Sequence, residues 1–379
     1  MRIFHNLNVD FMSRRKMFYI LSSVIIVLGF ISMAIRGMHF GIDFKGGLEV
    51  VLNFEKPVSL NEMRAKANQI GIGNPEIKTF GTNGILIRTD VQNITQKQVE
   101  ELKSYTENMF KTLNSNIKYN LVKSNQDEYI YSFSNADTAQ KVVQILLDNG
   151  AQAGRVLEEN NETLVSVRLS LADYIKMKLK NLFPNNDFEV IKVDKVGPKV
   201  GDELKTTAII AVALSILGIL IYLAFRFKFI FALGAVIALF HDVLITLAVY
   251  SLLYGVIPGL NLEISLTVLA AFLTLIGYSV NDTVIVFDRI REQLKIYKNI
   301  DNLYKHINDA INKTMSRTIL TGGTTLISII VLLLFGGEVL RAFAFTLFIG
   351  IITGTYSSIF VASAIVLDYS LKIKKKIEF

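Results

Sequence analysis

The sequence predicts an α+β membrane protein in which a six-helix transmembrane bundle carries an outer-side soluble domain of one or two ferredoxin-like βαββαβ units. Three observations lead to this fold class. The 379 residues are 51% hydrophobic with only 5 prolines, a composition typical of integral membrane proteins. The apolar residues gather into six long runs. Between the first two runs lies a polar block, 37–205, with the alternation and turn signals of small mixed units.

Each of the six apolar runs is long enough to cross about 30 Å of hydrocarbon at about 1.5 Å per helical residue. The first run could instead be a cleaved signal peptide, but it lacks a convincing small-x-small exit and five further runs follow it. We therefore interpret all six as membrane spans. They are Phe18–Ile35, Thr207–Phe225, Phe229–Leu252, Ile264–Phe287, Arg317–Leu334 and Phe343–Leu367.

Basic residues beside the spans orient the chain, because Lys and Arg accumulate on the cytoplasmic side of membrane proteins. Arg14-Arg15-Lys16 precede the first span, Lys374-Lys375-Lys376 follow the sixth, and segment 288–316 is rich in Lys and Arg. The loop before the fourth span has Glu263 and no basic residue. Both termini and segment 288–316 are therefore predicted in the cytoplasm. The same grouping accounts for the net charge of +7 without nucleic acid as a partner.

The outer block has the order of two successive split-βαβ units. Ser59 and Glu62 form a capping box, Thr95 and Gln98 suggest another, and Asn83-Gly84 marks a hairpin turn. The predicted elements are, in chain order, Leu48–Phe54, Ser59–Ile70, Glu76–Phe80, Ile85–Arg88, Thr95–Leu113, Ile117–Val122, Glu128–Phe133, Ala136–Asn149, Ala153–Leu157, Thr163–Leu169, Leu171–Leu182 and Phe188–Val196.

Four parts follow from these elements. Residues 1–36 hold the cytoplasmic N-terminus and first span, 37–123 the first outer unit and 124–205 the second outer unit. Residues 206–379 hold five spans, the cytoplasmic segment 288–316 and a basic C-terminal tail.

Ionisable residues lie inside two of the predicted spans. A charge in hydrocarbon costs several kcal/mol, so such residues usually face the bundle interior and mark an ion path. His241 and Asp242 lie about 18 Å from the cytoplasmic start of the third span, and Asp282 about 9 Å from the cytoplasmic end of the fourth. Arg317 begins the fifth span on that side, which predicts an Asp282–Arg317 pair. Arg317 as an interfacial anchor and His241–Asp242 as a structural polar pair remain alternatives.

Small residues mark one face of the sixth span, where Gly350, Gly354 and Ser358 recur every four residues. Such stripes let helices pack closely, and a smooth face also allows helices to slide. Apolar residues on one face of 301–315 predict an amphipathic helix on the membrane surface.

The composition excludes several kinds of chemistry. The chain has no cysteine, and its four histidines, which include His5 and His306, show no metal-ligand spacing. No glycine-rich phosphate loop ends in Gly-Lys-Ser/Thr. We therefore expect no metal, no organic cofactor and no ATPase activity, and we predict protons as the coupling ion.

At these residues the chain resembles the SecD/SecF family of protein-export membrane proteins, and its SecF members in particular, within the resistance-nodulation-division superfamily. The segments that carry the resemblance are GIDFKGG at 41–47, VGPKVGDEL at 196–204, RFKFIFALGAVIALFHDVLIT at 226–246, IGYSVNDTVIVFDRIRE at 276–292, MSRTILTGGTT at 315–325 and LFIGIITGTYSS at 347–358.

The resemblance implies a complex with SecD, association with the SecYEG translocon, an unfolded preprotein as cargo and the bacterial cytoplasmic (inner) membrane as location. It also implies that the proton-motive force moves the outer domain, with part of the relay supplied by SecD. Because the family normally has one ferredoxin-like unit there, the resemblance makes 124–196 an extra unit. It assigns the proton relay to Asp282 and Arg317, with Asp242, His241 and Asn281 as further candidates, and the signature to Gly41, Asp43, Phe44, Gly46 and Gly47.

Two other functions remain open at this stage. A stand-alone proton-driven exporter of lipids or small molecules would carry its whole relay in one chain, whereas here the fourth span has a single Asp. A scaffold that only stabilises a translocon would tolerate Asp282→Asn. Contact with membrane lipids is expected in every case.

Overall fold

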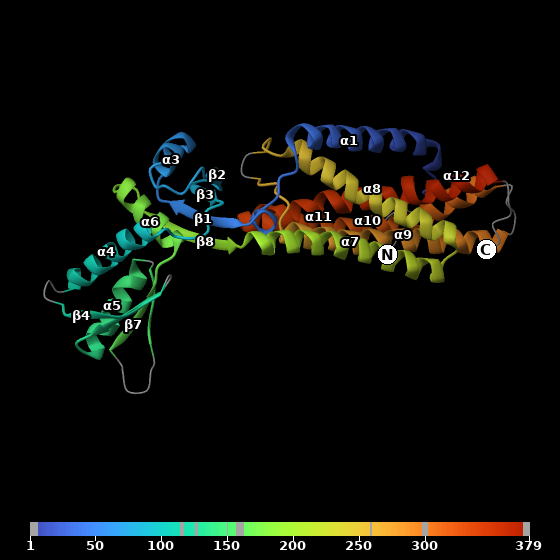
Figure 1. The fold of residues 1–379 in the computed structure, drawn as a ribbon. Helices are drawn as coiled ribbons and strands as arrows, with labels where there is room; N and C mark the ends of the chain where they lie inside the picture. The colour runs from blue at the N-terminus through green and yellow to red at the C-terminus, as the bar shows by residue number, and fades with distance from the viewer. Residues whose placement is uncertain are drawn as a thin grey trace. The chain divides into compact units, whose positions relative to one another are not determined.

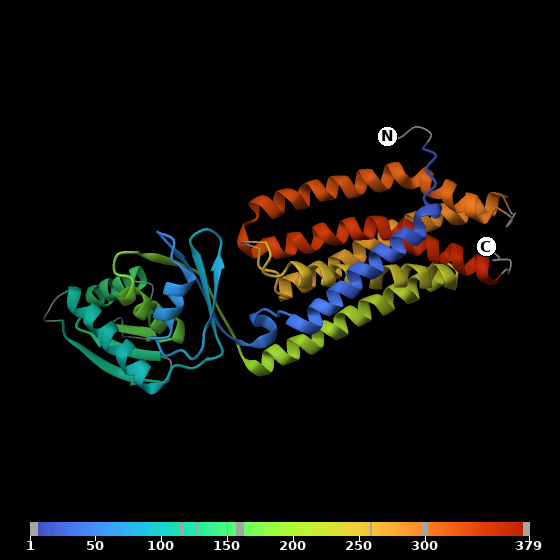
Figure 2. The same cartoon turned by 90° about the horizontal axis from the view of Figure 1, so that it is seen from above.

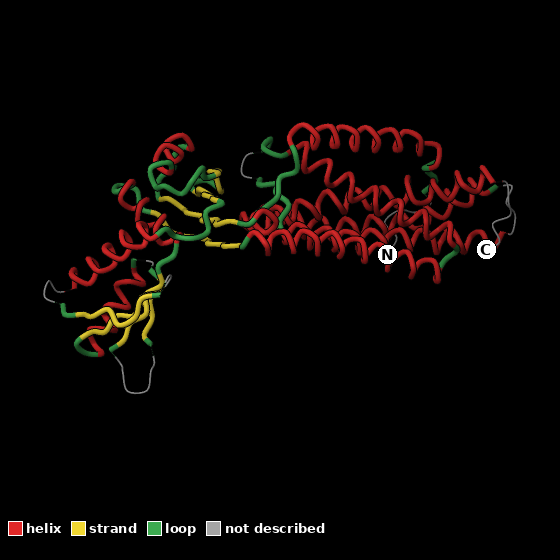
Figure 3. Tube along the Cα trace, viewed as in Figure 1, coloured by secondary structure: helices red, strands yellow, loops and turns green. Residues whose placement is uncertain are grey.

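The computed structural model describes residues 7–113, 117–125, 128–149, 151–156, 163–257, 260–297 and 302–373. His5, Leu157 and the predicted basic tail from Lys374 onward lie outside these residues. The chain forms two compact units, which we call the membrane unit (Met1–Lys45 with Val200–Phe379) and the soluble unit (Gly46–Lys199). The membrane unit is helical, and the named strands belong to the soluble unit (Figure 3).

The six predicted spans are confirmed as helices, which lie side by side in both views of the membrane unit (Figures 1 and 2). The sixth is interrupted by a π-helical turn. The helices are α1 (Arg15–Arg36, after a 3-10 turn Met12–Arg14), α2 (Ile42–Lys45), α7 (Pro198–Arg226), α8 (Phe229–Leu253), α9 (Leu266–Tyr297), α10 (Leu303–Phe335), α11 (Gly337–Ser357), the π turn Ser358–Ala362 and α12 (Ser363–Ile373).

Segment 288–316 differs from its prediction. It is not a separate stretch, because α9 continues to Tyr297 and α10 runs unbroken from Leu303, which places Arg317 in mid-helix. The predicted surface helix at 301–315 is therefore wrong: its apolar face, including Ile307 and Ile311, is buried in protein. Neither Gly nor Pro interrupts 303–321, so nothing in the sequence ends the helix before Arg317.

The predicted start of the outer domain at residue 37 is also wrong, because residues 37–45 pack within the membrane unit. Gly41 N donates to Ile264 O at 2.8 Å, and Ile264 N donates to His39 O at 2.9 Å. The soluble unit begins only at Gly46 and ends at Lys199.

All twelve predicted elements of the soluble unit are present. Ser59 caps α3 by accepting from Glu62 N, which is one of the two bonds of the predicted capping box. Thr95 and Gln98 bond reciprocally at the start of α4, as their sequence pattern predicts. The elements are β1 (Gly47–Phe54), α3 (Leu60–Ala67), β2 (Glu76–Phe80), β3 (Gly84–Thr89), α4 (Gln96–Leu113), β4 (Tyr119–Ser124), β5 (Glu128–Phe133), α5 (Ala136–Asp148), β6 (Gln152–Arg155), β7 (Leu164–Arg168), α6 (Leu171–Leu182) and β8 (Phe188–Val196).

The two predicted tandem units, 37–123 and 124–205, are wrong in their connectivity. One sheet has the order β2-β3-β1-β8 and the other β4-β5-β7-β6, so each sheet takes its fourth strand from the other predicted unit. Both sheets keep the strand order of a ferredoxin-like fold. The second unit is thus inserted into the first, between β3 and α6.

Packing explains the exchange. Phe110 on α4 meets the rings of Tyr119 and Tyr131 at 5.2 Å, which fixes α4 and β4 on the second sheet. Phe183, just after α6, meets Phe54 of β1 at 5.2 Å, and β8 pairs antiparallel with β1 along its length. Alternation along a strand predicts its buried face but not which of two sheet edges it joins.

Candidate functional site

Asp242 on α8 is the more deeply buried of the two Asp residues that lie within predicted spans, with 1% of its surface exposed. Its Oδ1 lies 3.0 Å from Nδ1 of His241. Its Oδ2 accepts from Ser279 Oγ on α9 at 2.5 Å and from Ser357 Oγ on α11 at 2.9 Å. Three helices therefore converge on this one carboxylate.

His241 extends the network toward α1. Its Nε2 lies 2.7 Å from Ser22 Oγ and 3.1 Å from the Tyr356 hydroxyl. The two hydroxyl groups are themselves 3.2 Å apart. Because imidazole has one donor and one acceptor when neutral, the ring can relay a proton between these hydroxyls and Asp242.

Asp282 on α9 is the other of these two Asp residues, with 6% of its surface exposed. Its Oδ1 accepts from Thr318 Oγ1 on α10 at 3.0 Å. Its Oδ2 accepts from Ser358 Oγ at 2.9 Å. Ser279, which donates to Asp242, precedes Asp282 by three residues on α9. The contact of α9 with Asp242 therefore lies about one helical turn from Asp282.

Consecutive serines join the two carboxylates. Ser357 donates to Asp242 and Ser358 donates to Asp282, and these residues lie where α11 passes into the π-helical turn. In the turn the backbone N–H of Ser363 bonds to Ser358 O, the i to i+5 pattern. Such turns occur often at functional sites. Each carboxylate is therefore hydrogen-bonded to a residue in this turn or directly before it.

Close packing positions the serines. A Cβ on Gly350 would lie 2.5 Å from the Leu275 side chain, and one on Gly354 would lie 3.0 Å from Cβ of Ser279. Glycine at these positions lets α11 approach α9 closely enough for Ser357 and Ser358 to reach both carboxylates.

Arg317 and Asn281 are not where the sequence pattern suggests. Both are exposed on the surface of the membrane unit. Within the described part of the chain, no hydrogen bond or ion pair joins Arg317 to Asp282. The predicted direct pair is therefore wrong in this conformation. The neighbouring Thr318, about 100° further around α10, faces Asp282 instead.

The signature segment 41–47 contacts the N-terminal end of α9, the helix that carries Asp282. Asp43 Oδ2 accepts from Leu266 N at 2.8 Å and so caps the helix that carries Asp282. Gly46 and Gly47 have positive φ values of 75° and 122°, and a Cβ on Gly47 would lie 2.6 Å from Thr89 O. Phe44 is buried. The motif thus combines a helix cap with a turn into β1 that needs glycine.

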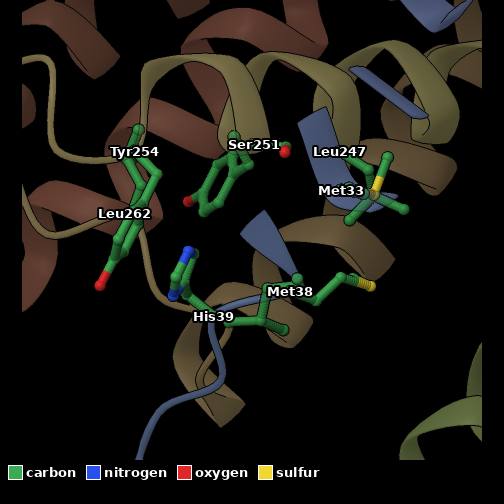
Figure 4. A pocket seen from close by; sticks show the side chains of 10 residues that line it. Met33, Met38, His39, Leu247, Ser251, Tyr254 and Leu262 are labelled. Carbon is green, nitrogen blue, oxygen red and sulfur yellow. The ribbon is translucent and has the colours of Figure 1, made fainter. Parts of the chain in front are cut away.

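Figure 4 shows His39, just before this segment, with Tyr254 among the side chains that line a small pocket. Its ring stacks on Tyr254 at 3.5 Å beside a cavity of about 20 Å³ that Met33 and Met38 also line. This volume fits about one water molecule. His39 is therefore a packing residue of the segment.

Sequence reasoning missed the hydroxyl residues of the network. They are Ser22, Ser279, Thr318, Tyr356, Ser357 and Ser358, the last of which was predicted only as a small packing residue. Ser279 had a usable signal, because it shares a helix face with Asp282 at i−3. Among the described residues no group of three or more His, Cys, Asp or Glu side chains could hold a metal ion.

Comparison with known proteins decides the family. The family described as "Protein export membrane protein SecD/SecF, C-terminal" matches residues 175–372, and the "SecD/SecF GG Motif" matches 31–58. Protein translocase subunit SecF of Rhodothermus marinus is 37% identical over 97% of this chain and 95% of its own length. The chain belongs to the SecD/SecF family. SecF of Calditerrivibrio nitroreducens is 38% identical over 97% of this chain and 96% of its own length.

These SecD/SecF relatives correct one expectation. They match this chain over nearly their whole length, so an outer block of this size is ordinary among them and 124–196 is not an extra unit. The fold agrees with solved structures of the same family. SecDF of Thermus thermophilus, 28% identical with a TM-score of 0.65, covers 97% of this chain, and SecDF in a super-membrane-facing form has a TM-score of 0.56. The chain spans about two fifths of each SecDF chain.

Proposed function

We propose that this multi-pass membrane protein is an accessory subunit of the Sec preprotein translocase that uses the proton-motive force, together with SecD, to drive late steps of protein export. The observation that carries the proposal is the pair of buried carboxylates joined through Ser357 and Ser358. Within the described ranges neither carboxylate forms an ion pair with Lys or Arg.

Proton binding suits this arrangement. A carboxylate inside hydrocarbon costs several kcal/mol, and it gains by taking up a proton. A serine hydroxyl can donate to a carboxylate and, after rotation, accept from a carboxylic acid. Ser357 and Ser358 can therefore follow the protonation of Asp242 and Asp282 without leaving their places.

The energy source is large enough for mechanical work. One proton that crosses 100 mV releases about 2.3 kcal/mol, so a few protons match a typical conformational step. We propose that protonation alters the Ser357–Ser358 hydrogen bonds and thereby the π turn, whose rearrangement shifts α11 against α9. Arg317 and Asn281, exposed on the same helices α10 and α9, would complete the relay with groups of a partner subunit.

The partners follow from the family. SecD is proposed because the SecDF chains contain this chain's fold in about two fifths of their length. The SecYEG translocon is proposed because SecDF of Thermus thermophilus is described as translocon-associated. An unfolded preprotein would be the cargo, protons the coupling ion and no nucleotide hydrolysed. The location would be the bacterial inner membrane, with both termini in the cytoplasm and the soluble unit outside.

A stand-alone exporter of lipids or small molecules is not favoured. The relatives that this chain matches over nearly their full length are named protein translocase subunits. A passive scaffold would tolerate Asp282→Asn, whereas the proposed proton relay would not, so an export assay distinguishes the two functions.

The test is export of a secreted precursor by cells that depend on this protein, at equal membrane levels and with or without a proton uncoupler. Asp282→Asn and Asp242→Asn keep the shape and a hydrogen bond but cannot titrate. We expect both to lower export to the level that wild type shows with uncoupler, with little further loss on adding it. Asp368→Asn, which alters a carboxylate paired with Arg15 outside the network, is the matched control. Wild-type export by both network variants would make the protein a scaffold.

A further inference from the structure

An apolar cavity of about 370 Å³ lies in the membrane unit, and neither Asp242 nor Asp282 lines it. Segment 38–44 forms one wall with Phe40 and Phe44, and α7 forms another with Ile209 and Val212. Residues of α8 and the first turns of α9, including Leu269, complete it. A volume of this size lies within the range of about 300–1,000 Å³ of small-molecule sites.

The lining has a single charge at one end. Lys205 is the one charged residue among the described residues that line the cavity, and its ammonium lies 5.0 Å from the centre of the Phe40 ring. Lys205, Ala208, Ile209 and Val212 follow each other at i, i+3, i+4 and i+7 along one face of α7. The charge is thus separated by about 10 Å of helix from the far apolar end.

The cavity opens toward the surroundings of the bundle, because α7 is covered by protein over little of its surface and Ile209 is 66% exposed. Lys205 lies near the N-terminal end of α7, the end that follows the soluble unit in the chain. With that unit outside, the charge lies at the outer interface and the apolar residues point toward the membrane centre. An amphiphile with an anionic head and an apolar tail would match this arrangement, with its head at Lys205 and its tail along the apolar residues.

We propose that this cavity binds a phospholipid of the outer leaflet, with one acyl chain between α7 and α8–α9 and the phosphate at Lys205. Charge complementarity at one end and an apolar lining elsewhere favour this occupant over an apolar helix or peptide. An apolar segment would offer no anionic group to the ammonium of Lys205. The bound lipid would brace segment 38–44 and, through the Asp43 cap, the start of α9. The inference rests on the orientation proposed above but not on the proton relay, because the cavity and the carboxylate network share no residue.

The chain has no tryptophan, so one introduced indole reports on one place. Phe272→Trp places it in the cavity lining, and Phe225→Trp, at a site 90% exposed on α7, places it in bulk lipid as a control. The full chain would be reconstituted in bilayers that contain phospholipid or diacylglycerol, each with brominated acyl chains that quench indole fluorescence. We expect the cavity indole to be quenched by the phospholipid with about fivefold higher relative affinity than by diacylglycerol.

Lys205→Gln, added to Phe272→Trp, should remove this preference at the cavity indole, and added to Phe225→Trp it should leave the control indole unchanged. Equal affinities of both lipids for the cavity indole would refute recognition of the phosphate. A cavity indole that no brominated lipid quenches would refute lipid as the occupant and leave a protein segment in its place. Val243→Trp, at a second lining position, repeats the measurement if Phe272→Trp disturbs folding. Because these readouts are spectroscopic, they stand whether or not export of the Asp282→Asn variant is impaired.

Discussion

The soluble unit buries Arg88 against Glu49 with 2.5 Å between their charged atoms, whereas the membrane unit buries Asp242 and Asp282 against hydroxyl groups. Arg88 and Glu49 are 5% and 6% exposed, so the two environments are equally closed. An arginine partner keeps a carboxylate ionised, because guanidinium stays charged at any physiological pH. A hydroxyl partner serves both protonation states. The first arrangement fixes a structure, and the second can move a proton.

Removal of Arg88 should give the largest loss of stability. Arg88→Leu leaves the buried Glu49 with Lys192, whose Nζ lies 3.7 Å away, as its one cationic partner among the described residues. Breaking a buried pair costs about 3–5 kcal/mol, because the remaining charge is uncompensated. Hydrogen exchange of the full-length protein, followed in peptides from β1 and β3, measures this free energy. Lys103→Met, at a partly exposed ion pair with Glu107, is the control, with an expected loss below about 1 kcal/mol.

An Arg88→Leu protein with unchanged exchange in β1 would overturn the contrast between the units. Replacement of both partners should recover most of the loss, since no unpaired charge then remains.

Removal of one hydroxyl from the membrane network should give a smaller loss. Ser357→Ala and Ser358→Ala each take one donor from a buried carboxylate, which costs about 1–3 kcal/mol. Both should also weaken uncoupler-sensitive export. Unfolding of the full chain in mixed micelles measures the first effect. Ser363→Ala is the control, because its hydroxyl donates to the backbone oxygen of Ser358 and, in the described part of the chain, to no carboxylate. Equal losses for all three variants would mean that the two serines have no special link to the carboxylates.

The same contrast explains what could be predicted from the sequence. Asp242, His241 and Asp282 stand out because ionisable residues are rare in apolar runs. Their hydroxyl partners come from α1, α9, α10, α11 and the π turn. A Ser or Thr in an apolar helix usually bonds its own backbone, as Ser215 does with Ala211. Nothing local distinguishes Ser357 from such residues. Arg317 was misplaced for a related reason: its position along α10 follows from the sequence, but its direction around the helix depends on packing.

In the soluble unit the limit was topological. Every strand and helix followed from caps, turns and alternation, but the choice of partner for β4 and β8 did not. The short connection from β4 to β5 favours a hairpin across the predicted boundary, and this was the signal that the tandem interpretation missed.

The smallest loss of stability is expected at the ion pair that joins α6 to α4 in the soluble unit. Lys178 on α6 lies 2.6 Å from Glu101 on α4. The hydrogen bond from Lys178 lowers the pKa of Glu101, and the same bond raises the pKa of Lys178. Stability from Glu101 is therefore present above its ordinary pKa and lost as the pH falls through the lowered value. Stability from Lys178 is present below its ordinary pKa and lost as the pH rises through the raised value.

The ion pair should thus stabilise the soluble unit over a broad neutral range and weaken at both extremes. Because both side chains are about one third exposed, solvent screens the pair, and its loss should lower the melting temperature by no more than about 2–4 °C. Thermal unfolding of the full chain, followed through the β-sheet signal between pH 4 and neutral pH, measures the difference between wild type and Glu101→Gln. The two proteins should converge as the pH falls. A melting-temperature difference between the two proteins that grows toward acid pH would contradict the lowered pKa of Glu101. The charges of this partly exposed pair would then contribute no stability, unlike those of Arg88 and Glu49.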